Sequence, residues 1–367
     1  MIRAAVMPGP NQPVEVREFP RPELEPGAAL LRVEFSEVCG TDLHLQGGRL
    51  SETPYPLIPG HAVVGTLEEI RGEVKDVHGE PLAVGGRVTF LDVHGTCGAC
   101  WYCLVAKATT RCPSRKVYGI TYGAEEGLLG GWCEYVYLKP GVRIIRLPEG
   151  LPSETVIGGG CGLPTALHAV DRADIALAGI VLVQGTGPVG LSAVALASLR
   201  GPSRVIAIGA PERRLARAQE MGADYVLDVV GTSPAERCSA VMEATRGRGA
   251  DVVIEASGNP AAVPEGLDLV RDNGRYVIVG QYTDHGSVEV NPHLQINKKH
   301  VDIRGVWGID YSHLHRALVL QQRYNERFHW ERLITHRFGL DQANEALASV
   351  RSGEAIKAVI EPHRKNA

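Results

Sequence analysis

Hydrophobic and polar positions in the first 155 residues alternate in short runs bounded by proline and glycine. Short alternating runs with such boundaries are typical of β-strands joined by turns. The pattern predicts strands at residues 14–19, 29–35, 62–70, 87–91 and 134–138. We therefore expect this part of the chain to form a partly open β-barrel or sandwich with long loops, one of which, at residues 73–83, resembles an added hairpin.

The pattern changes near Thr155, after which buried strands alternate with helices. We expect strands at residues 179–184, 204–208, 225–227, 251–255 and 275–279, helices at 188–200 and 212–221, and further helical segments between the later strands. Such alternation predicts a parallel, doubly wound sheet. The last segment contains two expected helices, at 311–321 and 340–350, and a strand at 358–361.

The composition is that of an ordinary globular enzyme. The 367 residues suffice for two domains, and 44% of them are hydrophobic while 22% are charged. A net charge of −4 gives no basic surface for nucleic acid. The first residues do not resemble a signal peptide, and no run approaches the roughly 20 apolar residues that span a bilayer. We therefore expect a cytoplasmic protein with no nucleic-acid or membrane partner and with reduced cysteines.

Four of the eight cysteines, Cys97, Cys100, Cys103 and Cys112, occur in a C-x2-C-x2-C-x8-C run within a glycine-containing stretch. Four thiolates this close in sequence can surround one tetrahedral Zn²⁺. Buried free cysteines or two disulfides are the alternatives, but buried cysteines seldom recur at intervals of three residues. The run predicts a structural zinc site, because four protein ligands leave the ion no open position.

A glycine motif follows the strand expected at 179–184. Its residues are Gly185, Thr186, Gly187, Pro188, Val189 and Gly190. A G-x-G-x-x-G motif between a buried strand and a helix is typical of dinucleotide binding. Gly185 permits the tight turn, Gly187 lets a pyrophosphate approach the backbone, and Gly190 allows close helix–strand packing. The positive end of the following helix then holds the diphosphate.

The choice between NAD and NADP depends on the end of the next strand. An NAD site usually has an acidic residue there that accepts the ribose hydroxyls. This chain has Gly209, followed by Glu212, Arg213 and Arg214. Either arginine could pair with a 2′-phosphate, which favours NADP slightly, whereas Glu212 could serve as the ribose acceptor for NAD.

A second set of metal ligands is dispersed along the chain. Cys39 follows a strand, His61 precedes the next strand, and Cys161 lies where the pattern changes. Two cysteines and one histidine are a known ligand set for catalytic zinc, which keeps an open fourth position. Spacing alone does not join residues about a hundred positions apart, and buried cysteines with a core histidine would explain the same residues.

The order of these motifs resembles that of the zinc-dependent alcohol dehydrogenases of the medium-chain dehydrogenase/reductase superfamily. The resemblance rests on the segments beginning at Cys39 and Gly60, the Cys₄ run, and the segments beginning at Cys161 and Gly185. It extends to residues 130–135 and 249–258, so it covers nearly the whole chain. It implies a GroES-like catalytic domain at residues 1–155 and 304–367, with an inserted Rossmann domain at 156–303.

The resemblance also implies the roles of individual residues. Cys39, His61 and Cys161 would bind the catalytic zinc, Asp42 would orient His61, and Thr41 would begin a proton relay to His44. Thr165 would lie beside the nicotinamide. Lys357 matches a basic residue that contacts the diphosphate, although a surface lysine is the alternative reading. The implied protein oxidises an alcohol with NAD or NADP, contains two zinc ions and is a homodimer or homotetramer.

One departure from the family pattern concerns the residue after His61. Relatives commonly have glutamate there, where it can approach the zinc, whereas this chain has Ala62. Two other functions therefore remain open: a zinc-free quinone or enoyl reductase of the same superfamily, and a non-catalytic dinucleotide-binding protein. The three ligand residues argue against both.

Overall fold

The computed structural model describes residues 1–364, which divide into two compact units. Of these residues, unit 1 comprises Met1–Cys161, Asp310–Asn325 and the chain from His329 onward, and unit 2 comprises Gly162–Ile309 with Glu326–Phe328. The boundaries lie six residues after those expected at 155 and 303, because helix α3 and the Cys161 turn group with the strands of unit 1.

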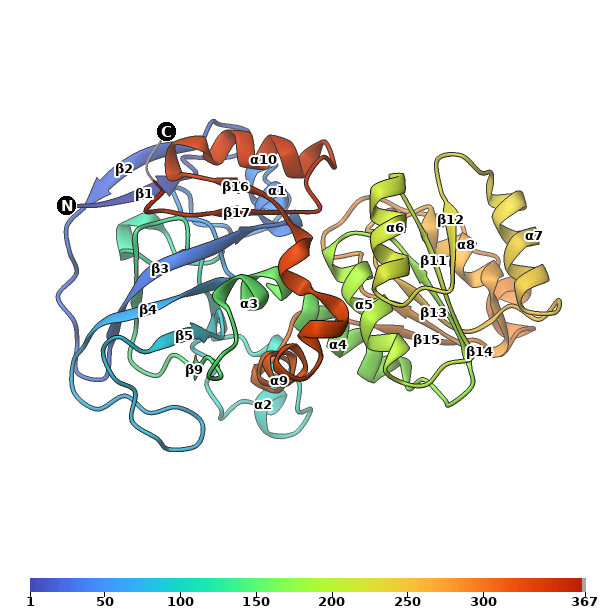
Figure 1. Ribbon diagram of the computed structural model, residues 1–367, viewed down its shortest axis with the longest axis horizontal. Helices are drawn as coiled ribbons and strands as arrows, with labels where there is room; N and C mark the ends of the chain where they lie inside the picture. Colours follow the sequence, from blue (N-terminus) through green and yellow to red (C-terminus); the bar gives the residue numbers. More distant parts are fainter. Residues whose placement is uncertain (365–367) are drawn as a thin grey trace. The chain divides into compact units, whose positions relative to one another are not determined.

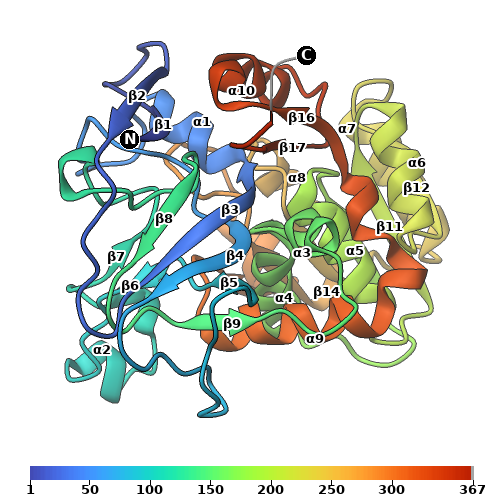
Figure 2. The same ribbon diagram turned by 60° about the vertical axis from the view of Figure 1, so that its left-hand side comes forward.

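Unit 1 is built on a seven-stranded sheet with the order β16-β17-β3-β4-β5-β9, and β8 also pairs with β3 (Figures 1 and 2). Its neighbours pair antiparallel except β16 and β17, which are parallel. Two small sheets, β1-β2 and β6-β7, complete the unit. The central strand β3 carries buried residues on both faces over its last four positions, which places its end inside the core.

The strands of unit 1 are β1 Ile2–Val6, β2 Glu15–Phe19, β3 Ala29–Val38, β4 Val63–Ile70, β5 Arg87–Phe90, β6 Val93–His94, β7 Lys116–Val117, β8 Tyr135–Leu138, β9 Ile144–Arg146, β16 Ile334–Phe338 and β17 Lys357–Ile360. Its helices are α1 Gly40–Gln46, α2 Trp101–Leu104, α3 Ser153–Gly159, α10 Ala343–Arg351 and α9 Tyr311–Phe328, of which the last three residues group with unit 2. Four short 3₁₀ helices lie at Thr109–Arg111, Ala124–Glu126, Trp330–Leu333 and Leu340–Gln342.

Unit 2 is a parallel six-stranded sheet with the order β12-β11-β10-β13-β14-β15. Strand order reverses between β10 and β13, which is where doubly wound sheets bind their ligands. Helices α5 and α6 pack against β10, β11 and β12, and α8 packs against β13 and β14 (Figure 1). The predicted combination of a GroES-like domain with a Rossmann sheet is confirmed.

The strands of unit 2 are β10 Ile180–Gln184, β11 Arg204–Gly209, β12 Tyr225–Asp228, β13 Ala250–Glu255, β14 Val270–Ile278 and β15 Asp302–Gly305. Its helices are α4 Gly162–Ala173, α5 Pro188–Ser198, α6 Glu212–Glu220, α7 Pro234–Ala244 and α8 Ala262–Leu269, with a π-helix at Pro292–Asn297.

Two expectations about local structure have clear outcomes. The segment at 73–83 is a hairpin-like loop, closed by a bridge between Lys75 and Pro81. The expected helix at 311–321 extends to Phe328, because the polar residues that end its apolar pattern lie on its exposed face.

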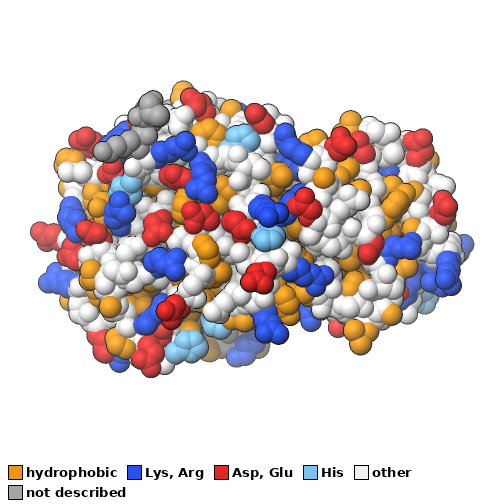
Figure 3. Space-filling model, in the orientation of Figure 1, with side chains coloured by type: hydrophobic (Ala, Val, Ile, Leu, Met, Phe, Trp, Pro, Cys, Tyr) orange, Lys and Arg blue, Asp and Glu red, His pale blue; other side chains and the backbone are white. Residues whose placement is uncertain are grey.

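The surface agrees with the modest net charge. On the face shown in Figure 3, acidic and basic side chains are interspersed. Within residues 1–364, no helix is both long enough and apolar enough to cross a membrane.

Candidate zinc sites and dinucleotide turn

The four cysteines of the Cys₄ run converge in the loop that carries α2. Their sulfurs lie 3.6 Å apart between Cys100 and Cys103, 3.9 Å between Cys100 and Cys112, and 3.6 Å between Cys97 and Cys112. A disulfide requires about 2.05 Å. Sulfurs at the corners of a tetrahedron with Zn–S bonds of about 2.3 Å would lie about 3.8 Å apart. The geometry therefore fits one zinc ion and does not fit disulfides.

Backbone groups in this loop favour the thiolate form that zinc requires. The N–H groups of Ala99 and Cys100 donate to the Cys97 sulfur, and the N–H of Cys97 donates to the Cys112 sulfur. The first two bonds, with the neighbouring thiols, lower the pKa of Cys97 to about 6. The loop is thus arranged to hold negative sulfur.

The dispersed ligand residues also converge. Cys39 directly follows β3, His61 precedes β4, and Cys161 follows α3. One donor atom of each lies within 4.8 Å of the others, and the Cys39 sulfur is 3.9 Å from His61 Nε2. Tetrahedral zinc would place these two atoms about 3.6 Å apart. The set supplies three ligands, which leaves a fourth position for a small molecule.

Electrostatics in this cluster suit a cation. The pKa of Cys39 is held well below its usual value, mainly by the Cys161 thiol and then by the His61 imidazole. Burial alone would lower the pKa of His61, but the nearby Cys39 charge raises it to about 10. Zinc binds neutral imidazole and thiolate. Binding of the metal therefore displaces the extra proton of the His61 imidazole and any proton still held by the two thiols.

Asp42 has a different contact from the expected one. Its side chain is fully buried, and Oδ2 accepts a hydrogen bond from the Cys39 N–H at 2.8 Å. Among the described residues 1–364, Asp42 Oδ1 and His61 Nδ1 have no hydrogen-bond partner. The backbone contact follows from the place of Asp42 in the first turn of α1, next to the N-cap residue Cys39. That Asp42 also orients His61 stays a prediction.

Thr41 and His44 lie three residues apart on α1, a spacing that puts two side chains on one face of a helix. Both are half-buried. The backbone N–H of Thr41 donates to the Cys39 sulfur at 3.3 Å, which fixes Thr41 next to the ligand. The relay between the two residues stays a prediction.

Lys357 is not a surface residue. Its side chain is fully buried, and Nζ lies 2.5 Å from Glu37 Oε1 and 3.3 Å from the Gly159 carbonyl oxygen. The surface-lysine alternative is wrong, because β17 lies inside the sheet and all four of its residues are buried. The diphosphate contact stays a prediction, and the contacts of Lys357 do not support it.

The glycine turn joins β10 to α5 in unit 2, as predicted. A Cβ on Gly190 would lie 1.9 Å from the Gly185 carbonyl oxygen, and a Cβ on Gly185 would lie 2.7 Å from the Ser257 nitrogen. These two glycines therefore serve the close packing of the turn. A Cβ on Gly187 would meet nothing within 4 Å, so this position faces open space. A diphosphate could use that space at the N-terminus of α5.

Pro188 and Val189 open helix α5, with Pro188 at its first position. Thr165 lies in α4, which packs along α5. A Cβ on Gly162, at the start of α4, would be 3.1 Å from the Pro188 backbone. Thr165 thus belongs to the same unit as the glycine turn, and its place beside the nicotinamide stays a prediction.

Gly209 is the last residue of β11 and packs closely against the Thr186 side chain. A Cβ at Gly209 would lie 2.1 Å from Thr186 Oγ1, so packing as well as charge requires glycine here. Arg213 is exposed and Arg214 half-buried in the first turn of α6. Burial, and secondarily the charge of Arg213, lowers the pKa of Arg214. Arg213 and Arg214 therefore place two positive charges just beyond β11, whose last residue, Gly209, has no carboxylate.

Sequence reasoning missed Glu37, which is 1% exposed and close to the dispersed ligand set. Its Oε2 accepts a hydrogen bond from the Cys161 N–H at 2.7 Å. The available signal was an acidic residue two positions before Cys39, near the end of an expected strand.

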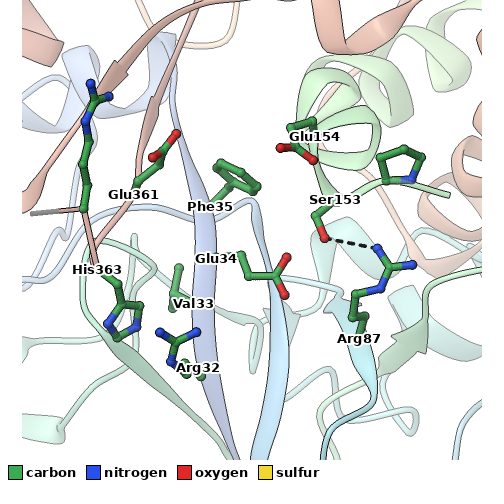
Figure 4. A pocket seen from close by; sticks show the side chains of 11 residues that line it. Arg32, Val33, Glu34, Phe35, Arg87, Ser153, Glu154, Glu361 and His363 are labelled. Carbon is green, nitrogen blue, oxygen red and sulfur yellow. Dashed lines mark hydrogen bonds between the residues drawn. The ribbon is translucent and has the colours of Figure 1, made fainter. Parts of the chain in front are cut away.

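A separate pocket in unit 1 lies along the middle of β3 (Figure 4). Phe35 and Glu34 line one side, and Arg87, which bonds to Ser153, lines the other. The pocket includes none of the ligand residues, and its acidic and basic side chains are balanced.

Comparisons with known proteins agree with this geometry. Residues 25–149 match the alcohol dehydrogenase GroES-like domain, and residues 188–322 match the zinc-binding dehydrogenase family. The chain is 36% identical to 5-exo-hydroxycamphor dehydrogenase of Pseudomonas putida and 30% identical to erythritol/L-threitol dehydrogenase of Mycolicibacterium smegmatis, each over 98% of both chains.

Solved structures give the same result. An alcohol dehydrogenase of Thermotoga maritima is 33% identical and superposes with a TM-score of 0.93 over 99% of both chains. A zinc-binding dehydrogenase of Sinorhizobium meliloti bound to NADP is 26% identical, with a TM-score of 0.86 over 99% of both chains.

The chain belongs to the zinc-dependent alcohol dehydrogenase family of the medium-chain dehydrogenase/reductase superfamily. It is an oxidoreductase that transfers hydride between an alcohol and NAD(P), and it uses zinc.

Proposed function

We propose that each chain binds two zinc ions, a catalytic one at Cys39, His61 and Cys161 and a structural one at the Cys₄ loop. The convergence of three donor atoms that leave a fourth position free is the observation that carries the proposal. When bound, the catalytic zinc acts as a Lewis acid that favours the alkoxide form of the alcohol.

The chain's own residues have distinct tasks in this reaction. The Thr41 hydroxyl hydrogen-bonds the alcohol oxygen. As it takes up the alcohol proton it gives its own proton to a relay that ends at His44, which releases a proton to solvent. Asp42 holds the Cys39 backbone in place through its 2.8 Å hydrogen bond. The glycine turn and α5 hold the dinucleotide, and Thr165 lies beside its nicotinamide.

For the substrate we propose a secondary alcohol that is oxidised to a ketone. The camphor relative is named for a hydroxylated ring compound, and the relative from Mycolicibacterium smegmatis is named for two polyols, erythritol and L-threitol. We test this by following nicotinamide reduction with paired secondary and primary alcohols of equal size. We expect faster oxidation of the secondary member of each pair. Faster oxidation of the primary members would overturn the substrate class, and no oxidation of any alcohol would overturn the function.

For the cofactor we propose NADP, bound through its 2′-phosphate by Arg213 and Arg214. A charge-assisted hydrogen bond contributes about 1.5–3 kcal/mol. The double substitution Arg213→Met/Arg214→Met should therefore lower kcat/KM for NADP by about 10- to 100-fold. Rates with NAD should change little and serve as the internal control. An equal loss with both cofactors would mean that these arginines do not select the phosphate. Gly209→Asp is a poorer test, because its Cβ would collide with Thr186.

For the diphosphate we expect Gly187→Ala to weaken dinucleotide binding without disturbing the fold. The added methyl group enters open space in the protein itself, but it would occupy the path of the pyrophosphate. We expect the Kd of the reduced cofactor, measured by fluorescence titration, to rise about tenfold or more. Gly190→Ala is the contrasting variant, because its clash with Gly185 should lower the melting temperature as well. An unchanged Kd in Gly187→Ala would place the diphosphate elsewhere.

We also propose a homodimer or homotetramer in the cytoplasm. The proposal of a reducing compartment rests on the eight cysteines, none of which forms a disulfide in the described chain.

A further inference from the structure

A buried ion pair next to Cys161 has no part in the reaction described above. Glu37 lies near the end of β3, and Lys357 opens the neighbouring strand β17. Their side chains are 1% and 0% exposed, and Oε1 and Nζ are 2.5 Å apart. Transferring two charges from water into a core is unfavourable, and a well-packed apolar pair often serves at least as well for stability. The retention of both charges therefore points to a role other than filling space.

The ion pair holds both ends of the turn that carries Cys161. Glu37 Oε2 accepts from the Cys161 N–H at 2.7 Å, and Lys357 Nζ donates to the Gly159 carbonyl oxygen at 3.3 Å. Gly160, between these two residues, has φ +49, and a Cβ there would lie 1.9 Å from Glu37 Oε2. The turn therefore packs directly on the carboxylate.

Glu37 is also connected to the chain segments that carry the other two ligands. Its backbone N–H donates to the Ala62 carbonyl oxygen at 3.0 Å, one residue after His61. Cys39 follows two residues later in the chain. Glu37 thus contacts or adjoins the backbone of all three ligand segments.

We propose that Glu37, neutralised by Lys357, is a positioning residue that fixes the Cys161 thiolate in the ligand triangle. The proposal rests on the proposed function, because it requires a metal at Cys39, His61 and Cys161. The carboxylate acts through Cys161 and does not itself bind the metal. Outer partners of metal ligands typically change metal affinity by about 10- to 100-fold when they are lost.

The test compares two double variants of the purified chain. Glu37→Met/Lys357→Met removes both charges and the acceptor for the Cys161 N–H, whereas Glu37→Gln/Lys357→Met keeps an uncharged acceptor. We measure Co²⁺ affinity by chelator competition, with the thiolate-to-cobalt absorption as the signal. The contribution of the Cys₄ site is subtracted with Cys39→Ser. We expect affinity at the three-ligand site to fall about 10- to 100-fold in the Met pair and to stay near that of the wild type in the Gln variant.

Thermal unfolding separates positioning from simple stability. Arg237→Met/Glu265→Met removes a largely buried ion pair of unit 2 and should leave cobalt affinity unchanged. If the Met pair lowers the melting temperature but keeps wild-type affinity and spectrum, the pair is merely structural and the proposal is wrong. Glu37→Leu/Lys357→Leu fills the same space with different apolar side chains. Wild-type cobalt affinity in this variant would likewise show that the ion pair is merely structural. If Cys161→Ser still binds two cobalt ions, the ligand set is wrong, and the proposed function fails together with this proposal.

Discussion

Replacing Cys39 by serine should abolish most of the activity while leaving the protein folded. The substitution removes one of only three protein ligands, and Lewis-acid stabilisation of developing charge contributes several kcal/mol. We expect kcat/KM for the alcohol to fall by about 1,000-fold or more. Metal analysis should show one zinc per chain in place of two, because the Cys₄ site does not depend on Cys39.

Cys238→Ser is the matched control for this experiment. Cys238 is a half-buried thiol of α7 that belongs to neither cluster, so its loss should change neither zinc content nor activity. Retention of two zinc ions in Cys39→Ser, or activity within about tenfold of the wild type, would contradict the assignment of Cys39 as a catalytic ligand.

Loss of the structural zinc should strongly lower the stability of the protein. Cys103→Ser breaks the tetrahedron of sulfurs, and the long loop that carries α2 has little other regular structure. Structural zinc has an apparent binding free energy of about 10–16 kcal/mol in zinc-finger peptides. Each 1 kcal/mol shifts Tm by about 2–4 °C in domains of 150–250 residues. We therefore expect Tm to fall by about 10 °C or more.

Calorimetry and limited proteolysis check this result. Cleavage should concentrate between residues 95 and 115, and the remaining zinc should stay at the three-ligand site. Cys238→Ser again provides the comparison, with an unchanged Tm. Wild-type melting and two retained zinc ions in Cys103→Ser would show that the four sulfurs do not hold a structural metal.

Much of this architecture is predictable because local patterns carry it. The Rossmann sheet follows from strand–helix alternation, and the glycine turn lies between β10 and α5 as its spacing indicates. The Cys₄ cluster is local as well, since its ligands fall within sixteen residues (97–112). In each case, the chemistry and the element that positions it lie in one short segment.

The dispersed site cannot be assembled in this way. Cys39 and Cys161 meet because β3 lies in the centre of the sheet and α3 returns to its end, a result of long-range pairing. Lys357 is about 320 residues from Glu37, yet β17 pairs with β3 and buries the two side chains together. Sequence reasoning therefore missed Glu37, since a contact across 124 or 320 residues leaves no local pattern.

Anomalous diffraction at the zinc edge, from crystals of the wild-type chain, tests the central claim most directly. We predict two peaks per chain. One should lie within the four sulfurs, and the other between the Cys39 sulfur, His61 Nε2 and the Cys161 sulfur, with its fourth position occupied by a non-protein ligand. A single peak at the Cys₄ loop, or a second ion enclosed by four protein ligands, would contradict the account.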